Sequence, residues 1–160
     1  MKILIALDAS PHSERALDFV TRMRWPAGSR VIVLSVLQPI VHAVSLPYEP
    51  TSIEADVLAE QKKQLEDLVS DAERRLRECG FSTEARVLTG DPRETLVQEA
   101  VATHADLLVV GSHGRTGIAK LMIGSVSSHL VTHAPCSVLV VKSADAGIRQ
   151  SAAGPSRRAS

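Results

Sequence analysis

The stretch DLLVVGSHGRTGIAKLMIGSVSSHL, residues 106–130, places a strand pattern, a glycine-rich loop and a helix start in direct succession. Residues 106–110 have the unbroken apolar character of a strand covered on both faces, and Gly111 follows them directly. Gly114 comes next, and after nine intervening residues Gly124 and Ser125 complete the pattern. Glycines between a strand and a helix are typical of loops that cradle phosphate in parallel α/β sheets. An ordinary glycine-rich connection is the alternative.

Three other apolar runs resemble this strand, and a fourth, weaker run mixes polar and apolar positions. The three are residues 3–7, 31–36 and 137–141, and the weaker one is residues 84–90, which we expect at an edge of the sheet. Helical patterns separate the runs, and they begin at Ser10 with Pro11, at Thr51, at Asp91 with Pro92, and at Ser125. This alternation predicts an open, doubly wound, Rossmann-like α/β fold with a parallel sheet and helices on both faces.

The longest helical pattern runs from Thr51 to Gly80. Thr51 and Glu54 have the spacing of a capping box, and Gly80 stands where a C-terminal glycine is common. Ile53 and Val57 begin an apolar stripe along this helix, which we expect to pack against the sheet.

Composition favours one compact domain, which we expect to span residues 1–142. Residues 143–160 are small, polar and unpatterned, so a disordered tail is expected there. The 18 basic residues balance the 18 acidic ones and aromatic residues make up 2% of the chain, which argues against a nucleic-acid partner. No apolar run is long enough to span a bilayer, and Cys79 and Cys136 stand alone, as reduced thiols of a cytoplasmic protein do.

Asp8 follows the first strand, and in open parallel sheets ligands bind at the carboxyl ends of strands. If the first and fourth strands are neighbours, this carboxylate and the glycine loop face one crevice. It is suited to accept hydrogen bonds from a ribose hydroxyl or an adenine amine, or to hold a phosphate-bound Mg²⁺ through water. Capping of the following turn with Ser10 is the alternative.

Two common phosphate motifs are missing. A Walker A loop requires glycine before its lysine, whereas Ala119 precedes Lys120, and the dinucleotide fingerprint does not follow the first strand. His113 invites a catalytic role, but sequence places no carboxylate or nucleophile to form a relay with it, so orienting the loop or touching phosphate is favoured. Residues 38–50 form a long connection that either covers a site at the strand ends or is slack.

Four segments together resemble the universal stress protein family. They are KILIALDASPHSERAL at residues 2–17, GDPRETL at residues 90–96, the glycine pattern with Ser125, and APCSVLVVK at residues 134–142. The resemblance covers residues 2–142, and its glycine pattern is similar to that of the ATP-binding branch. It implies a five-stranded sheet in the order 3-2-1-4-5, which would place the first and fourth strands side by side.

The resemblance also implies a set of binding residues. Asp8 and Val36 would lie near the adenine and ribose, Val110 against the sugar or base, and Gly111, Gly114, Arg115, Gly124, Ser125 and Val126 around the ribose and phosphates. Arg115 is also the choice on physical grounds, because it is a donor-rich cation in a phosphate loop, although a solvated loop charge is the alternative.

The resemblance implies an ATP-binding, regulatory stress-response protein whose nucleotide occupancy controls its conformation or its partners. A slow ATPase, or a nucleotidyl or phosphoryl transferase, is the alternative. Such transfer needs bound metal ions and a positioned base, and the crevice contains one clear carboxylate. The implied order puts the apolar strand Ser137–Val141 at a sheet edge, where an unpaired strand invites aggregation. We therefore expect a homodimer that pairs this strand with its copy.

Overall fold

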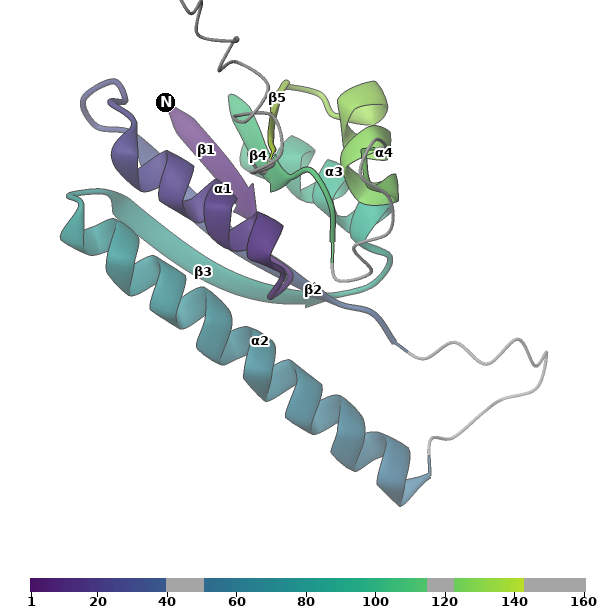
Figure 1. The fold of residues 1–160 in the computed structure, drawn as a ribbon. Coiled ribbons are helices and arrows are strands. Elements are labelled where there is room, and N and C mark those ends of the chain that lie inside the picture. Colours follow the sequence, from purple (N-terminus) through teal and green to yellow (C-terminus); the bar gives the residue numbers. More distant parts are fainter. Residues whose placement is uncertain (40–50, 115–122, 143–160) are drawn as a thin grey trace, which may run out of the picture.

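The computed structural model describes residues 1–39, 51–114 and 123–142. Its five strands form one sheet in the order β3-β2-β1-β4-β5, and all neighbouring strands run parallel (Figure 1). The strands are β1 (Lys2–Ala6), β2 (Arg30–Leu37), β3 (Ser82–Thr89), β4 (Leu107–Gly111) and β5 (Ser137–Val141). The predicted fold and strand order are confirmed, and the weaker run forms the edge strand β3.

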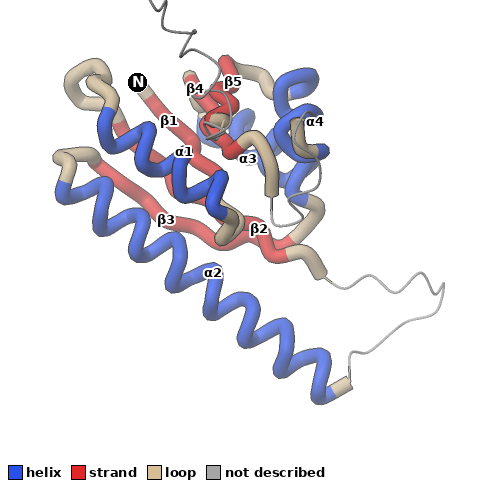
Figure 2. The backbone as a smooth tube through the Cα atoms, in the orientation of Figure 1, coloured by secondary structure: helices blue, strands red, loops and turns tan. Residues whose placement is uncertain are grey.

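Helices cover both faces of the sheet (Figure 2). On one face lie α1 (Pro11–Arg22) and α2 (Ser52–Glu78), and on the other lie α3 (Pro92–Thr103) and α4 (Ser125–His133). Within β1, Ile3 and Ile5 belong to the first core and Leu4 to the second, and all three are fully buried. Because the strand is covered on both sides, its sequence lacks the polar alternation of a half-exposed strand.

The capping box at the start of α2 is present, since the Thr51 side chain accepts from the Glu54 N–H and the Glu54 carboxylate accepts from the Thr51 N–H. The expected packing of Ile53 and Val57 is wrong, because these side chains are 74% and 42% exposed. Length explains the difference: 27 residues of helix span about 40 Å, whereas the eight residues of β3 span about 27 Å. The first turns of α2 therefore extend beyond the sheet (Figure 1).

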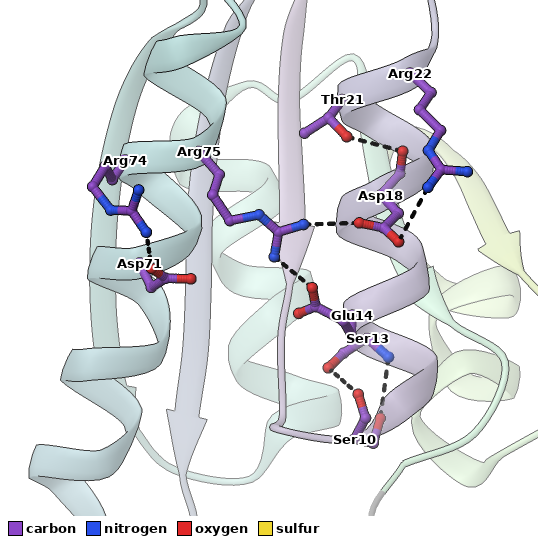
Figure 3. Close-up of polar contacts among 9 residues, drawn as sticks. All are labelled: Ser10, Ser13, Glu14, Asp18, Thr21, Arg22, Asp71, Arg74 and Arg75. Atoms are coloured by element: carbon purple, nitrogen blue, oxygen red, sulfur yellow. Dashed lines mark hydrogen bonds and ion pairs between the residues drawn. The ribbon is translucent and has the colours of Figure 1, made fainter.

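Arg75 of α2 ties this helix to α1 on the same face of the sheet. Its guanidinium pairs with the Glu14 carboxylate and donates to Asp18 Oδ1 at 2.8 Å (Figure 3). At the start of α1, Ser10 caps the helix by accepting a hydrogen bond from the Ser13 N–H. The first turns of α1 are therefore held by the Ser10 cap and by the ion pairs with α2.

Within the described ranges, no helix is both long and apolar enough to cross a membrane. The expected tail at residues 143–160 lies outside the described residues, and so does most of the long connection, residues 40–50.

Candidate functional site

A cavity of about 770 Å³ opens at the carboxyl ends of the central strands. The ends of β1, β2 and β4 form its floor, and the first turns of α3 and α4 form its walls. Its volume falls in the range of small-molecule sites. Toward β2 and α3 the described lining combines the apolar Leu34, Val36 and Leu96 with the polar Gln38, Asp91 and Arg93. Toward β4 and α4 it is rich in glycine and serine.

The predicted site residues that fall in the described ranges all line this cavity. They are Asp8, Val36, Val110, Gly111, Gly114, Gly124, Ser125 and Val126. Arg115 lies outside the described residues. The fold thus brings together, at one opening, side chains from segments that are distant in the sequence.

Asp8 holds the turn before α1 and also faces the glycine-rich segment. Its Oδ1 accepts a hydrogen bond from the Ser10 N–H at 3.1 Å, which is the capping role. Its Oδ2 lies 2.8 Å from the point where a Cβ on Gly114 would stand, so the carboxylate also faces the glycine loop. Parallel pairing of β1 with β4 creates this adjacency. Ala9, which follows, has a φ of 60°, a left-handed conformation that residues other than glycine adopt at a cost, often near functional sites.

Close packing requires glycine at position 111 and leaves little room for a side chain at position 124. A Cβ on Gly111 would lie 2.7 Å from the carbonyl carbon of His12, in the first turn of α1. A Cβ on Gly124 would lie 3.2 Å from the Cα of His113, and the Gly124 N–H donates to the Ser112 carbonyl at 2.7 Å. Residues 111–114 are therefore packed between α1 and the start of α4.

Within the described residues, the start of α4 has features that favour an anion. Gly124 is its N-cap, no side chain caps it, and its first turn contains no acidic residue. Helix geometry leaves the first-turn N–H groups without partners inside the helix, and the helix dipole favours negative charge there. Ser127 Oγ donates to the Gly111 carbonyl at 2.6 Å and so joins this turn to β4. Ser125 and Val126, the first residues of the helix, line the cavity.

His113 lies within the loop, and its contacts favour an orienting role over catalysis. Its Nδ1 lies 3.1 Å from Ser112 Oγ, and its ring centroid lies 5.0 Å from that of His12. Its carbonyl oxygen lies 3.5 Å from Ser10 Oγ. In the described part of the chain its Nε2 is buried without a hydrogen-bond partner. The imidazole therefore fills the space between the loop and α1.

Sequence reasoning missed two charged residues of this cavity, Asp91 and Arg93. It used the GDPRETL segment as a helix start and as part of the family resemblance, but not as part of the site. Asp91 indeed caps α3 by accepting from the Arg93 N–H at 2.9 Å. The available signal was that this segment follows a strand at its carboxyl end, the edge where ligands bind. Hydrogen bonding to the Arg93 guanidinium lowers the pKa of the Asp91 carboxyl to about 2.

Comparison with known proteins gives a consistent result over nearly the whole chain. The sequence pattern of the universal stress protein family matches residues 1–142. A universal stress protein of Thermus aquaticus is 29% identical over 140 residues, covering 88% of this chain and 97% of the relative.

Solved structures agree with the sequence relatives. The protein MJ0577 of Methanocaldococcus jannaschii superposes with a TM-score of 0.76 at 26% identity, covering 91% of this chain and 97% of that one. A universal stress protein family protein of Arabidopsis thaliana, solved with AMP bound, has a TM-score of 0.66 at 25% identity and covers 91% and 94% of the two chains.

Proposed function

Since this chain belongs to the universal stress protein family, we propose that it binds ATP and that nucleotide occupancy controls its conformation or its partners in a stress response. One observation carries the binding proposal. A single cavity joins an apolar end to a glycine loop and an uncapped helix start, with the Asp8 carboxylate between them. A nucleoside phosphate has this same order of base, sugar and anion. The stress role rests on family membership.

The phosphates belong at the β4 and α4 side of the cavity. Backbone N–H groups at Ser125 and Val126 face an anion there, in the field of the helix dipole. Gly111, Gly114 and Gly124 let the chain approach the phosphates closely. We also assign Arg115 to this end, as a cation for the phosphates.

The sugar belongs beside Asp8 and Val110, and the base beside Val36. Asp8 Oδ2 points toward the glycine loop and accepts from a ribose hydroxyl in this arrangement. The same carboxylate fits Mg²⁺ held through water, since magnesium in nucleotide sites commonly uses one or two carboxylates together with the phosphates. The AMP bound by the Arabidopsis relative supports an adenine nucleotide as the ligand class.

We further propose that the protein is a homodimer through β5. This strand stands at the sheet edge, and its side chains are only partly buried. Pairing with the same strand of a second copy would cover its apolar residues and complete its backbone hydrogen bonds. Light scattering at micromolar concentration tests this, and a monomer mass would contradict it.

The binding domain proposed here is residues 1–142, with residues 143–160 as a tail that is not needed for binding. A chain ending at residue 142 is expected to bind ATP as the full chain does, and a large loss of affinity would refute this division. Both cysteines are free thiols, which supports a reducing, cytoplasmic setting.

The decisive experiment denatures protein purified without added nucleotide and identifies released small molecules by mass spectrometry. Recovered ATP supports a stable binder, whereas recovered ADP, together with phosphate release from added ATP that an Asp8→Ala variant abolishes, would favour slow hydrolysis. An empty wild-type site that also fails to bind ATP by calorimetry refutes the proposed function.

A further inference from the structure

Arg93 lines the cavity from the first turn of α3. It follows Asp91 at the junction of β3 and α3, and both residues line the cavity. The Gly90 N–H donates to the Leu37 carbonyl at 3.0 Å, so the start of α3 is fastened to the end of β2. Arg93 therefore lies on the side of the cavity that also contains Val36 and Leu96.

The Arg93 guanidinium is held by the carboxylate of Asp91. Its Nε lies 3.1 Å from Oδ1 and its Nη2 lies 2.9 Å from Oδ2, which is a two-point pairing along one edge of the planar group. Such a pairing leaves both flat faces and Nη1 available, and the Arg93 side chain is 51% exposed. The pairing with Asp91 thus orients the planar guanidinium group of Arg93.

Charge balance argues that this pair does not serve phosphate. The Asp91 carboxylate largely cancels the Arg93 charge, and it would repel a phosphate placed next to it. An arginine paired in this way still stacks on an aromatic ring, because stacking uses the flat face and not the paired edge. Val36 and Leu96, which line the same side of the cavity, suit an aromatic base better than a phosphate.

We propose that Arg93, held by Asp91, stacks on the nucleobase and makes the site prefer purine nucleotides to pyrimidine nucleotides. This inference rests on the proposed function and adds a specificity-determining residue to it. Asp91 is a positioning residue that acts through Arg93. A purine has two fused rings to stack on the guanidinium, whereas a pyrimidine has one. The stacking contact should therefore contribute more to the affinity for ATP than to the affinity for CTP.

The test measures ATP and CTP affinity by calorimetry for four variants of the full chain. Arg93→Ala is expected to weaken ATP binding about three- to tenfold, the value of a partly exposed cation–π contact, and to weaken CTP binding by less than about twofold. Arg93→Lys keeps the charge but lacks the planar guanidinium, so its ATP and CTP affinities should match those of Arg93→Ala. Asp91→Asn keeps the helix cap, because asparagine caps as well as aspartate, and should give an intermediate loss for ATP.

Arg74→Ala is the matched control. Arg74 is an exposed helical arginine paired with Asp71 and Glu78 on α2, remote from the cavity, and its loss should leave both affinities unchanged (Figure 3). Thermal unfolding of each variant checks that the fold is intact.

The outcomes separate this inference from the proposed function. Failure of the wild-type protein to bind ATP overturns both. If the wild-type protein binds ATP, three results overturn the inference alone: wild-type affinity in Arg93→Ala, wild-type affinity in Arg93→Lys, or equal losses for ATP and CTP. A fall in the ATP to CTP affinity ratio in Arg93→Ala and Arg93→Lys, with Asp91→Asn between them and the wild-type protein, supports it.

Discussion

Replacement of Gly111 by alanine is expected to destabilise the fold even without a ligand. The new methyl group would lie 2.7, 2.8 and 2.9 Å from the carbonyl carbon, carbonyl oxygen and Cβ of His12. Two of these atoms are backbone of the first turn of α1, which Ser10 caps and Arg75 fastens to α2. Neither strand nor helix moves aside at low cost, so we expect a loss of about 1–3 kcal/mol in the free energy of unfolding.

Gly114→Ala is the matched comparison, because its methyl group meets a different kind of neighbour. Among the described residues, the neighbour of that Cβ within 4 Å is Asp8 Oδ2 at 2.8 Å, the end of a flexible side chain. The fold should keep its stability to within about 0.5 kcal/mol. The carboxylate must turn away from the loop, however, and ATP affinity should fall about tenfold or more, the value of a hydrogen bond to a charged group.

Urea unfolding of the two variants and the wild-type protein, without nucleotide, measures the difference. A domain of this size loses about 2–4 °C per kcal/mol, so thermal unfolding should place Gly111→Ala about 3–10 °C below Gly114→Ala. Equal stability of the two alanine variants would refute the argument from packing. Unchanged ATP affinity in Gly114→Ala would refute the role given to the Asp8 carboxylate.

Three further perturbations test other parts of the structure. Ser127→Ala removes the hydrogen bond to the Gly111 carbonyl and should cost about 1–3 kcal/mol in urea unfolding, whereas a cost near zero would contradict the buried pairing. Arg75→Ala removes the ion pairs between α2 and α1 and should cost about 1 kcal/mol at low salt, and a cost that does not shrink in high salt would refute their electrostatic origin. The pKa of Asp91 is lowered from 3.8 to about 2, so its stabilising effect is full above pH 3.8 and is lost as the pH falls toward 2. Asp91→Asn should flatten the pH dependence of urea unfolding in this window, and an unchanged slope would count against the pairing.

Most of the fold could be predicted from sequence because apolar runs and helix starts carry their own signals. Runs without polar alternation formed the strands, and the capping residues Ser10, Thr51 and Asp91 begin three of the helices. The order of the strands was not contained in these local patterns. It came from the family resemblance, and the pairing of β1 with β4 confirmed it.

Two features were not predicted, for the same physical reason. Local sequence does not show which other parts of the fold a segment will contact. The stripe at Ile53 and Val57 has helical spacing, yet periodicity does not reveal that the sheet ends before the helix does. Asp91 and Arg93 satisfy a helix start completely, so nothing within the segment indicated that this start borders the same cavity as β2 and β4.

The geometry of Asp8 explains how binding at this site can act on the rest of the fold. Its two oxygens divide their contacts, with Oδ1 accepting from the Ser10 N–H and Oδ2 facing the glycine loop. If a ligand engages Oδ2 as proposed above, it contacts the same carboxylate that holds the turn before α1. Arg75 joins the first turns of α1 to α2 through Glu14 and Asp18 (Figure 3). Through these contacts the start of α1, which follows the Asp8 turn, is joined to the longest helix.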